Sequence, residues 1–78
     1  MTLAFLFIEC IKDQAETVQK LAKQVHGVTE AHSTTGGFDL VVKVQTEDEH
    51  KLKHVVRAIK AIAGIAAVVT SIAYGNIS

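Results

Sequence analysis

Hydrophobic residues recur with two different periods along the chain. Residues 3–11 (LAFLFIECI) are apolar at both alternating positions, which is typical of a central strand buried on both faces. Residues 28–35 are rich in β-branched and small polar side chains, as expected of a strand near a sheet edge. Residues 38–44 and 65–74 complete the pattern. The sequence therefore predicts four strands.

Between these strands, two segments carry apolar side chains at helical spacing. A capping-box pattern predicts that the first helix opens at Asp13, and a similar pattern opens the second at Thr46. Gly27 and Gly64 are the expected stop signals. The apolar stripes consist of Ala15, Val18, Leu21, Ala22 and Val25 in the first helix, and of Leu52, Val55, Val56, Ile59, Ile62 and Ala63 in the second.

The order strand, helix, strand, strand, helix, strand indicates two interleaved βαβ units. It predicts an α+β, ferredoxin-like βαββαβ sandwich, with a four-stranded antiparallel sheet in the order 4-1-3-2 and both helices on one face. Gly36 and Gly37 predict a tight two-residue hairpin between the second and third strands. In the third strand, Phe38 is expected to share a face with Leu40. Residues 1–78 are expected to form a single domain, because a typical compact domain uses about 100–150 residues and the chain is too short for two.

One face of this sheet has no helix to cover it. Whichever alternating set of residues 3–11 faces the helices, the other set of large apolar side chains is left uncovered. Exposing each such side chain forgoes about 1.5–3 kcal/mol, and the sum rivals the stability of a small domain, about 5–15 kcal/mol. We therefore expect an obligate homodimer joined sheet face to sheet face, in preference to a monomer with an exposed apolar patch.

Composition narrows the possible partners and the compartment. Eight Lys and Arg residues balance eight Asp and Glu residues, which argues against binding to nucleic acid or an anionic membrane. The single cysteine, Cys10, excludes an internal disulfide and a four-thiolate zinc site. No signal peptide pattern and no apolar run of about 18 residues is present. We expect a cytoplasmic protein.

The four histidines are candidates for metal binding or catalysis. His50 and His54 are four residues apart, a spacing that can chelate, but they lie opposite the apolar stripe without a third ligand, so we expect a solvated helix face. His26 suits the negative end of the first helix dipole, and His32 belongs to a polar row on a strand. Cys10 lacks an evident base. We expect no metal, no cofactor and no enzymatic activity.

The turn at residues 34–39 (TTGGFD) is the remaining candidate for a binding site. Gly36 and Gly37 expose backbone N–H groups that can hold a carboxylate, and Asp39 can bind an ammonium group a few Å away. Together they suit an α-amino acid. The alternative is that the two glycines only form the hairpin turn, and local chemistry alone favours that alternative.

Residues 35–44 (TGGFDLVVKV) resemble the Thr-Gly-x-Tyr-Asp turn and apolar strand of the Lrp/AsnC effector-binding domain, the RAM domain of leucine- and asparagine-responsive regulators. The resemblance extends over residues 3–74. It implies dimerisation through the sheet, rings of four or five dimers (an octamer or decamer), and amino acids or related small molecules bound between dimers near the glycine turn. The implied ligand-binding residues are Gly36, Gly37, Phe38, Asp39 and, near the effector side chain, Thr70. Phe38 lacks the hydroxyl of the family's Tyr, and Val68 stands where the family often has a polar residue.

Because the DNA-binding half of the family has no counterpart in the chain, we expect a stand-alone module that binds an amino acid or small metabolite and does not contact DNA. The alternative is an interaction module that co-assembles with full-length Lrp/AsnC regulators without a ligand of its own. A small enzyme of the related dimeric α/β-barrel type is disfavoured, because the apolar first strand offers no polar group to a barrel interior.

Overall fold

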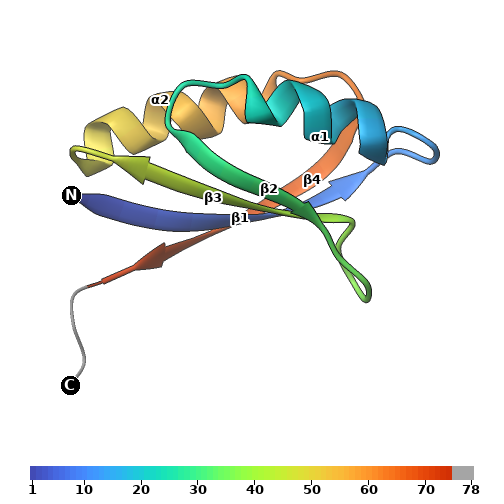
Figure 1. The fold of residues 1–78 in the computed structure, drawn as a ribbon, viewed down its shortest axis with the longest axis horizontal. Coiled ribbons are helices and arrows are strands. Elements are labelled where there is room, and N and C mark those ends of the chain that lie inside the picture. Colours follow the sequence, from blue (N-terminus) through green and yellow to red (C-terminus); the bar gives the residue numbers. More distant parts are fainter. Residues whose placement is uncertain (75–78) are drawn as a thin grey trace.

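The computed structural model describes residues 1–74 and has the predicted order of elements (Figure 1). The elements are β1 (Thr2–Cys10), α1 (Ala15–Lys23), β2 (Val28–Ser33), β3 (Leu40–Thr46), α2 (Glu49–Lys60) and β4 (Ile65–Ala73). The four strands form one antiparallel sheet in the order β2-β3-β1-β4. The α+β, ferredoxin-like fold and the strand order are thus confirmed.

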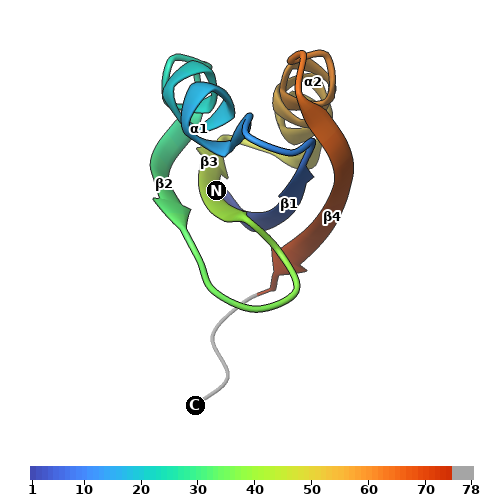
Figure 2. The same ribbon diagram turned by 90° about the vertical axis from the view of Figure 1, so that its right-hand side faces the viewer.

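Both helices lie on the same face of the sheet, and the other face is left open (Figures 1 and 2). The central strand β1 pairs with β3 on one side and with β4 on the other. The sheet curves around the helices in the view of Figure 2. None of the helices formed by residues 1–74 has the length and apolar character needed to span a membrane.

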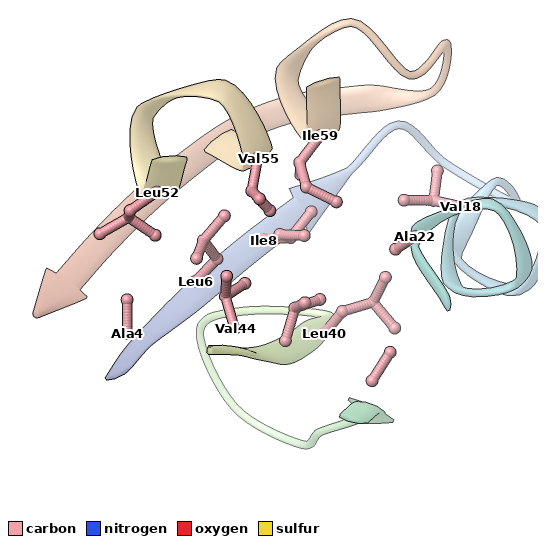
Figure 3. Close-up of a cluster of buried hydrophobic side chains, with 12 residues drawn as sticks. Ala4, Leu6, Ile8, Val18, Ala22, Leu40, Val44, Leu52, Val55 and Ile59 are labelled. Carbon is pink, nitrogen blue, oxygen red and sulfur yellow. The ribbon is translucent and has the colours of Figure 1, made fainter. Parts of the chain in front are cut away.

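The core lies between the helices and the helix-facing side chains of the sheet (Figure 3). In β1 the helix-facing set is Ala4, Leu6 and Ile8, all fully buried. The paired strand β3 contributes Leu40, Val42 and Val44, and the helices contribute Val18, Ala22, Leu52, Val55 and Ile59. Among residues 1–74 no polar or charged side chain is buried in this core. The core is held by hydrophobic burial and packing.

The two halves of the fold are related by matching glycines. Gly27 follows the last residue of α1 by four positions and Gly64 follows the last residue of α2 by four, and their φ angles are 102° and 100°. A Cβ added at Gly27 would lie 2.8 Å from Cγ2 of Val55, and one at Gly64 would lie 3.0 Å from Cγ2 of Val18. Each glycine therefore permits a strand start to approach the helix of the other half.

The predicted N-caps of the helices are wrong by one residue in α1 and by two residues in α2. Asp13 adopts a left-handed φ of 67°, and the N-cap of α1 is Gln14, whose side chain makes no capping hydrogen bond. In α2 the N-cap is Asp48, whose Oδ1 accepts a 2.8 Å hydrogen bond from the Lys51 amide. Thr46 instead ends β3, and its hydroxyl donates to the Asp48 carbonyl at 2.8 Å. Asp tolerates the left-handed conformation better than most residues, which explains Asp13.

The connection between β2 and β3 is longer than the predicted two-residue hairpin. The Thr34 amide donates a 2.9 Å hydrogen bond to the Asp39 carbonyl, which leaves residues 35–38 as the loop. Only one glycine of the pair, Gly36, has a positive φ, at 107°. A two-residue turn of the predicted type needs two such residues, so the chain forms a wider loop.

The edge strand β4 is chemically unusual. It is nine residues long (IAAVVTSIA), it contains neither a charged residue nor a proline, and it pairs with β1 along one side.

Candidate functional site

The loop of residues 34–39 (the glycine loop) lies at the end of β2 on the side of the sheet away from the helices (Figure 2). The Thr34 hydroxyl donates a 2.6 Å hydrogen bond to the Phe38 carbonyl, which closes the loop. A Cβ added at Gly36 or Gly37 would meet no atom within 4 Å, so the space around both is open. Within residues 1–74 the amides of residues 35–38 have no hydrogen-bond acceptor. They are free to bind an anionic group.

Asp39 is anchored to the end of β1. Its amide donates to the Ile8 carbonyl at 2.9 Å, and its Oδ2 accepts a 2.7 Å hydrogen bond from the Cys10 amide. The donor, Cys10, lies at an irregularity of the β1–β4 register, between Glu9 and Cys10. No local sequence pattern signals this contact, because Cys10 and Asp39 are 29 positions apart. The carboxylate is thus fixed in place, and its Oδ1 makes no hydrogen bond within residues 1–74.

The Cys10 thiol is not suited to nucleophilic catalysis. Burial and, to a smaller extent, the nearby Asp39 carboxylate raise the pKa of Cys10 above its ordinary value. A raised pKa keeps the thiol protonated at neutral pH, whereas the thiolate is the nucleophile.

Phe38 joins the glycine loop to the open face. Its ring lies 5.7 Å from that of Phe7, centroid to centroid, at an interplanar angle of 48°. Phe7 belongs to the alternating set of β1 that faces away from the helices, so the prediction that Phe38 shares the face of Leu40 is wrong. The loop extends through Phe38, and the alternation of β3 begins only at Leu40.

Thr70 does not meet the glycine loop within one chain. It pairs with the fully buried Leu6, and its neighbours of the same parity, Val68 and Ile72, pack against the core. Thr70 therefore points to the helix side of the edge strand β4, where it remains exposed. The structure brings together Gly36, Gly37, Phe38 and Asp39 but leaves Thr70 on the opposite face of the sheet. The role of all five as ligand-binding residues stays a prediction.

The open face carries an apolar patch beside a polar group. We define the patch as the outward side chains Leu3, Phe5, Phe7, Val41 and Val69, of which Val69 is 51% exposed. Beside it, Oε1 of Glu30 lies 2.9 Å from Nε2 of His32 and its Oε2 lies 3.4 Å from Nζ of Lys43. The hydrogen bond to His32, and to a smaller extent the one to Lys43, hold the pKa of Glu30 below its usual value.

A groove that sequence analysis missed lies at the other end of β3. It is a groove of about 750 Å³, and its lining residues include Val25, His26, Gln45, Lys51, His54 and Val55. These residues come from segments far apart in the sequence, so no local pattern could reveal the groove. Its lining combines apolar side chains with the ammonium group of Lys51, which forms a 3.0 Å ion pair with Glu47.

The histidines of residues 1–74 belong to no large cluster of metal-ligating side chains. Among residues 1–74 no group of three or more His, Cys, Asp or Glu side chains is close enough to hold an ion. His50 and His54 are exposed on α2, as the sequence predicts, and their Nε2 atoms are 3.4 Å apart.

Together, the element order and the sheet topology define a small α+β domain of the ferredoxin-like class. Residues 3–78 match the model of the Lrp/AsnC ligand binding domain, and the chain belongs to this family.

Solved structures and curated proteins are also similar to this chain. TTHA0845 from Thermus thermophilus is 25% identical, with a TM-score of 0.93 over 100% of this chain and 99% of that one. AsnC from E. coli is 26% identical, with a TM-score of 0.88 over 96% of this chain and 52% of that one. Homocitrate synthase from Saccharolobus islandicus is 29% identical over 70 residues, which are 88% of this chain and 15% of the enzyme. The chain therefore spans about half of AsnC and a small part of the curated relatives.

Proposed function

We propose that this domain binds an amino acid or a related small metabolite at the glycine loop, in an assembly built on a dimer. The single observation that carries the proposal is the juxtaposition of free loop amides with a fixed carboxylate. The amides of residues 35–38 suit the α-carboxylate of the ligand, and Asp39, held by Cys10, suits its ammonium group. The Lrp/AsnC ligand binding domain match supports the same function.

The proposed dimer forms through the open face. The apolar patch gives a second copy a hydrophobic surface to cover, and burial of such side chains is the main driving force for association. The glycine loop lies on the same side of the sheet, in contact with the patch through Phe38 and Phe7. Assembly would therefore place the loop close to the boundary between chains. Further assembly of four or five dimers into an octamer or decamer belongs to the same proposal.

Isothermal titration against the twenty amino acids tests ligand binding. We expect at least one of them to release or absorb heat, and Asp39→Asn to abolish that signal. Asp39→Asn is the appropriate variant because its side-chain carbonyl can still accept the Cys10 hydrogen bond while the charge is lost. Absence of heat with all twenty amino acids, or unchanged binding to Asp39→Asn, would contradict the proposed site.

Light scattering on the purified chain tests assembly. We expect the mass of a dimer or a multiple of it, and a shift toward one chain's mass in Val69→Asp, which places a charge on the apolar patch. Ile11→Asp is the matched control, because Ile11 is 55% exposed, like Val69 at 51%, but lies outside the patch. A wild-type particle with the mass of one chain would refute the dimer.

The alternative function is co-assembly with full-length Lrp/AsnC regulators. It is supported by the overlay of this chain on the matching part of AsnC at a TM-score of 0.88, which makes mixed pairing through the same face feasible. Co-purification of the chain with such a regulator, and its loss in Val69→Asp, would favour this function. We propose neither catalysis nor direct DNA contact for the domain, whose net charge of zero provides no attraction for phosphates.

A further inference from the structure

The imidazole rings of His50 and His54 converge on the exposed side of α2. Their Nε2 atoms are 3.4 Å apart, while the ring centroids are 5.0 Å apart with an interplanar angle of 87°. The nitrogens are closer together than the ring centres, so the Nε2 ends of the two rings point toward a common region. The four-residue spacing on a helix places both side chains on one face, one turn apart.

This separation fits two ligands of one metal ion. Two nitrogens bonded at about 2.0–2.1 Å to a tetrahedral ion lie about 3.3–3.4 Å from each other. The competing interaction is a hydrogen bond between two neutral rings, with one Nε2 donating and the other accepting. At 3.4 Å, the contact is longer than the range of about 2.7–3.2 Å that is usual for N–H···O hydrogen bonds.

We propose that His50 and His54 form a two-point site for a transition-metal dication of the zinc and copper class. Neutral imidazole is a favoured ligand of Zn²⁺, Cu²⁺ and Ni²⁺. Two protein ligands leave two positions of a tetrahedral ion for water or for a donor atom of another molecule. The sequence argued against a site because it offered no third ligand. The structure also shows no third ligand within residues 1–74, but it shows that the two nitrogens converge.

The surroundings leave both rings available. Within residues 1–74 neither Nε2 contacts another side chain at hydrogen-bond distance outside this pair, and both residues are exposed. Asp48 lies near enough to interact with His50. Its pKa is lowered chiefly by the hydrogen bond from the Lys51 amide, with a smaller contribution from His50. Its negative charge partly offsets the cations Lys53 and Arg57 on the same helix.

Titration of the full chain with ZnCl2 in a calorimeter tests the site. We expect one Zn²⁺ per chain, and a loss of affinity greater than about tenfold in His50→Gln and in His54→Gln, because removal of even an outer-shell partner costs about 10–100-fold. His32→Gln is the matched control, since His32 is also exposed but lies on β2, and it should bind Zn²⁺ like the wild type.

A second measurement excludes an indirect effect of the substitutions. Zn²⁺ held across one helical turn should slow amide hydrogen exchange within α2 of the wild type and not of His54→Gln. Three results would overturn the proposal: failure of the wild type to bind Zn²⁺, wild-type affinity in His50→Gln or His54→Gln, or an equal loss of affinity in His32→Gln. These outcomes are independent of amino-acid binding at the glycine loop.

Discussion

The Cys10 amide donates a 2.7 Å hydrogen bond to Oδ2 of Asp39, and this bond joins the glycine loop to the last residue of the central strand. The same carboxylate is our candidate for binding a ligand ammonium group. Its structural and functional roles must therefore be separated by experiment.

We expect Asp39→Ala to lower the free energy of unfolding by about 1–3 kcal/mol, because it leaves a partly buried amide without an acceptor. Asp39→Asn retains an acceptor and should cost less than about 1 kcal/mol. Urea denaturation followed by circular dichroism measures both values. Equal losses in the two variants would show that the charge, and not the hydrogen bond, stabilises the loop.

Cys10 should react slowly with thiol reagents. Burial, and secondarily the Asp39 carboxylate, raise the pKa of Cys10, so less thiolate is present at pH 8 than in an exposed cysteine. Asp39→Asn removes the second cause and should accelerate modification by less than about tenfold, a change of one pKa unit. The rate of iodoacetamide labelling, followed by mass spectrometry, provides the measurement. A reaction as fast as that of a free cysteine in the wild type would contradict the burial of the thiol.

Asp48 should make stability depend on pH in acid. The hydrogen bond from the Lys51 amide lowers the pKa of Asp48, so its contribution is complete above the unfolded pKa, about 3.9, and is lost as the pH falls through the lower folded pKa. We expect Asp48→Ala to lower Tm at pH 7 by a few degrees.

Asp48→Asn is the control for that prediction. Asn caps helices about as well as Asp but does not titrate, so the variant should retain most of the Tm at pH 7. Below about pH 4, near the pKa of Asp in the unfolded chain, its Tm should fall less steeply than that of the wild type. Thermal melts from pH 2.5 to pH 7 distinguish the variants. An identical acid decline in Asp48→Asn and the wild type would exclude Asp48 as its source.

Substitutions at Gly27 and Gly36 distinguish the stability cost of backbone strain from that of steric contact. Both have a positive φ, 102° and 107°, but an added Cβ would lie 2.8 Å from Val55 at Gly27 and would meet nothing within 4 Å at Gly36. Gly36→Ala should cost about 1–2 kcal/mol from backbone strain. Gly27→Ala should cost about 1–3 kcal/mol more, from overpacking. Chemical denaturation of both variants measures the difference, and equal costs would show that Val55 moves aside freely.

The order of elements and the sheet order were predictable because periodicity and glycine positions are local signals. Which alternating set of β1 faces the helices was not predictable, because both sets are apolar. The structure assigns the core to Ala4, Leu6 and Ile8, in register with Leu40, Val42 and Val44 of β3. Strand register depends on pairing between distant segments, and shifting it by one residue exchanges the two faces.

The candidate site was predictable in part. The glycine loop was found because Gly36, Gly37 and Asp39 are adjacent in sequence. The anchor from Cys10 was missed because it depends on a contact across 29 residues. Thr70 was associated with the loop by family resemblance, but its pairing with Leu6 places it on the helix side, a fact that only the β1–β4 register reveals.

The long uncharged edge strand β4 has a consequence for handling the protein. Within residues 1–74 its outer backbone edge is unpaired, which makes it a template for adding strands from other chains, and β4 lacks the lysines or prolines that act as gatekeepers against aggregation. We therefore expect concentrated preparations to precipitate when β4 frays. Ser71→Lys would place a charge on this edge strand, but Ser71 pairs with Phe5 of the apolar patch, so the same change should also weaken the proposed dimer.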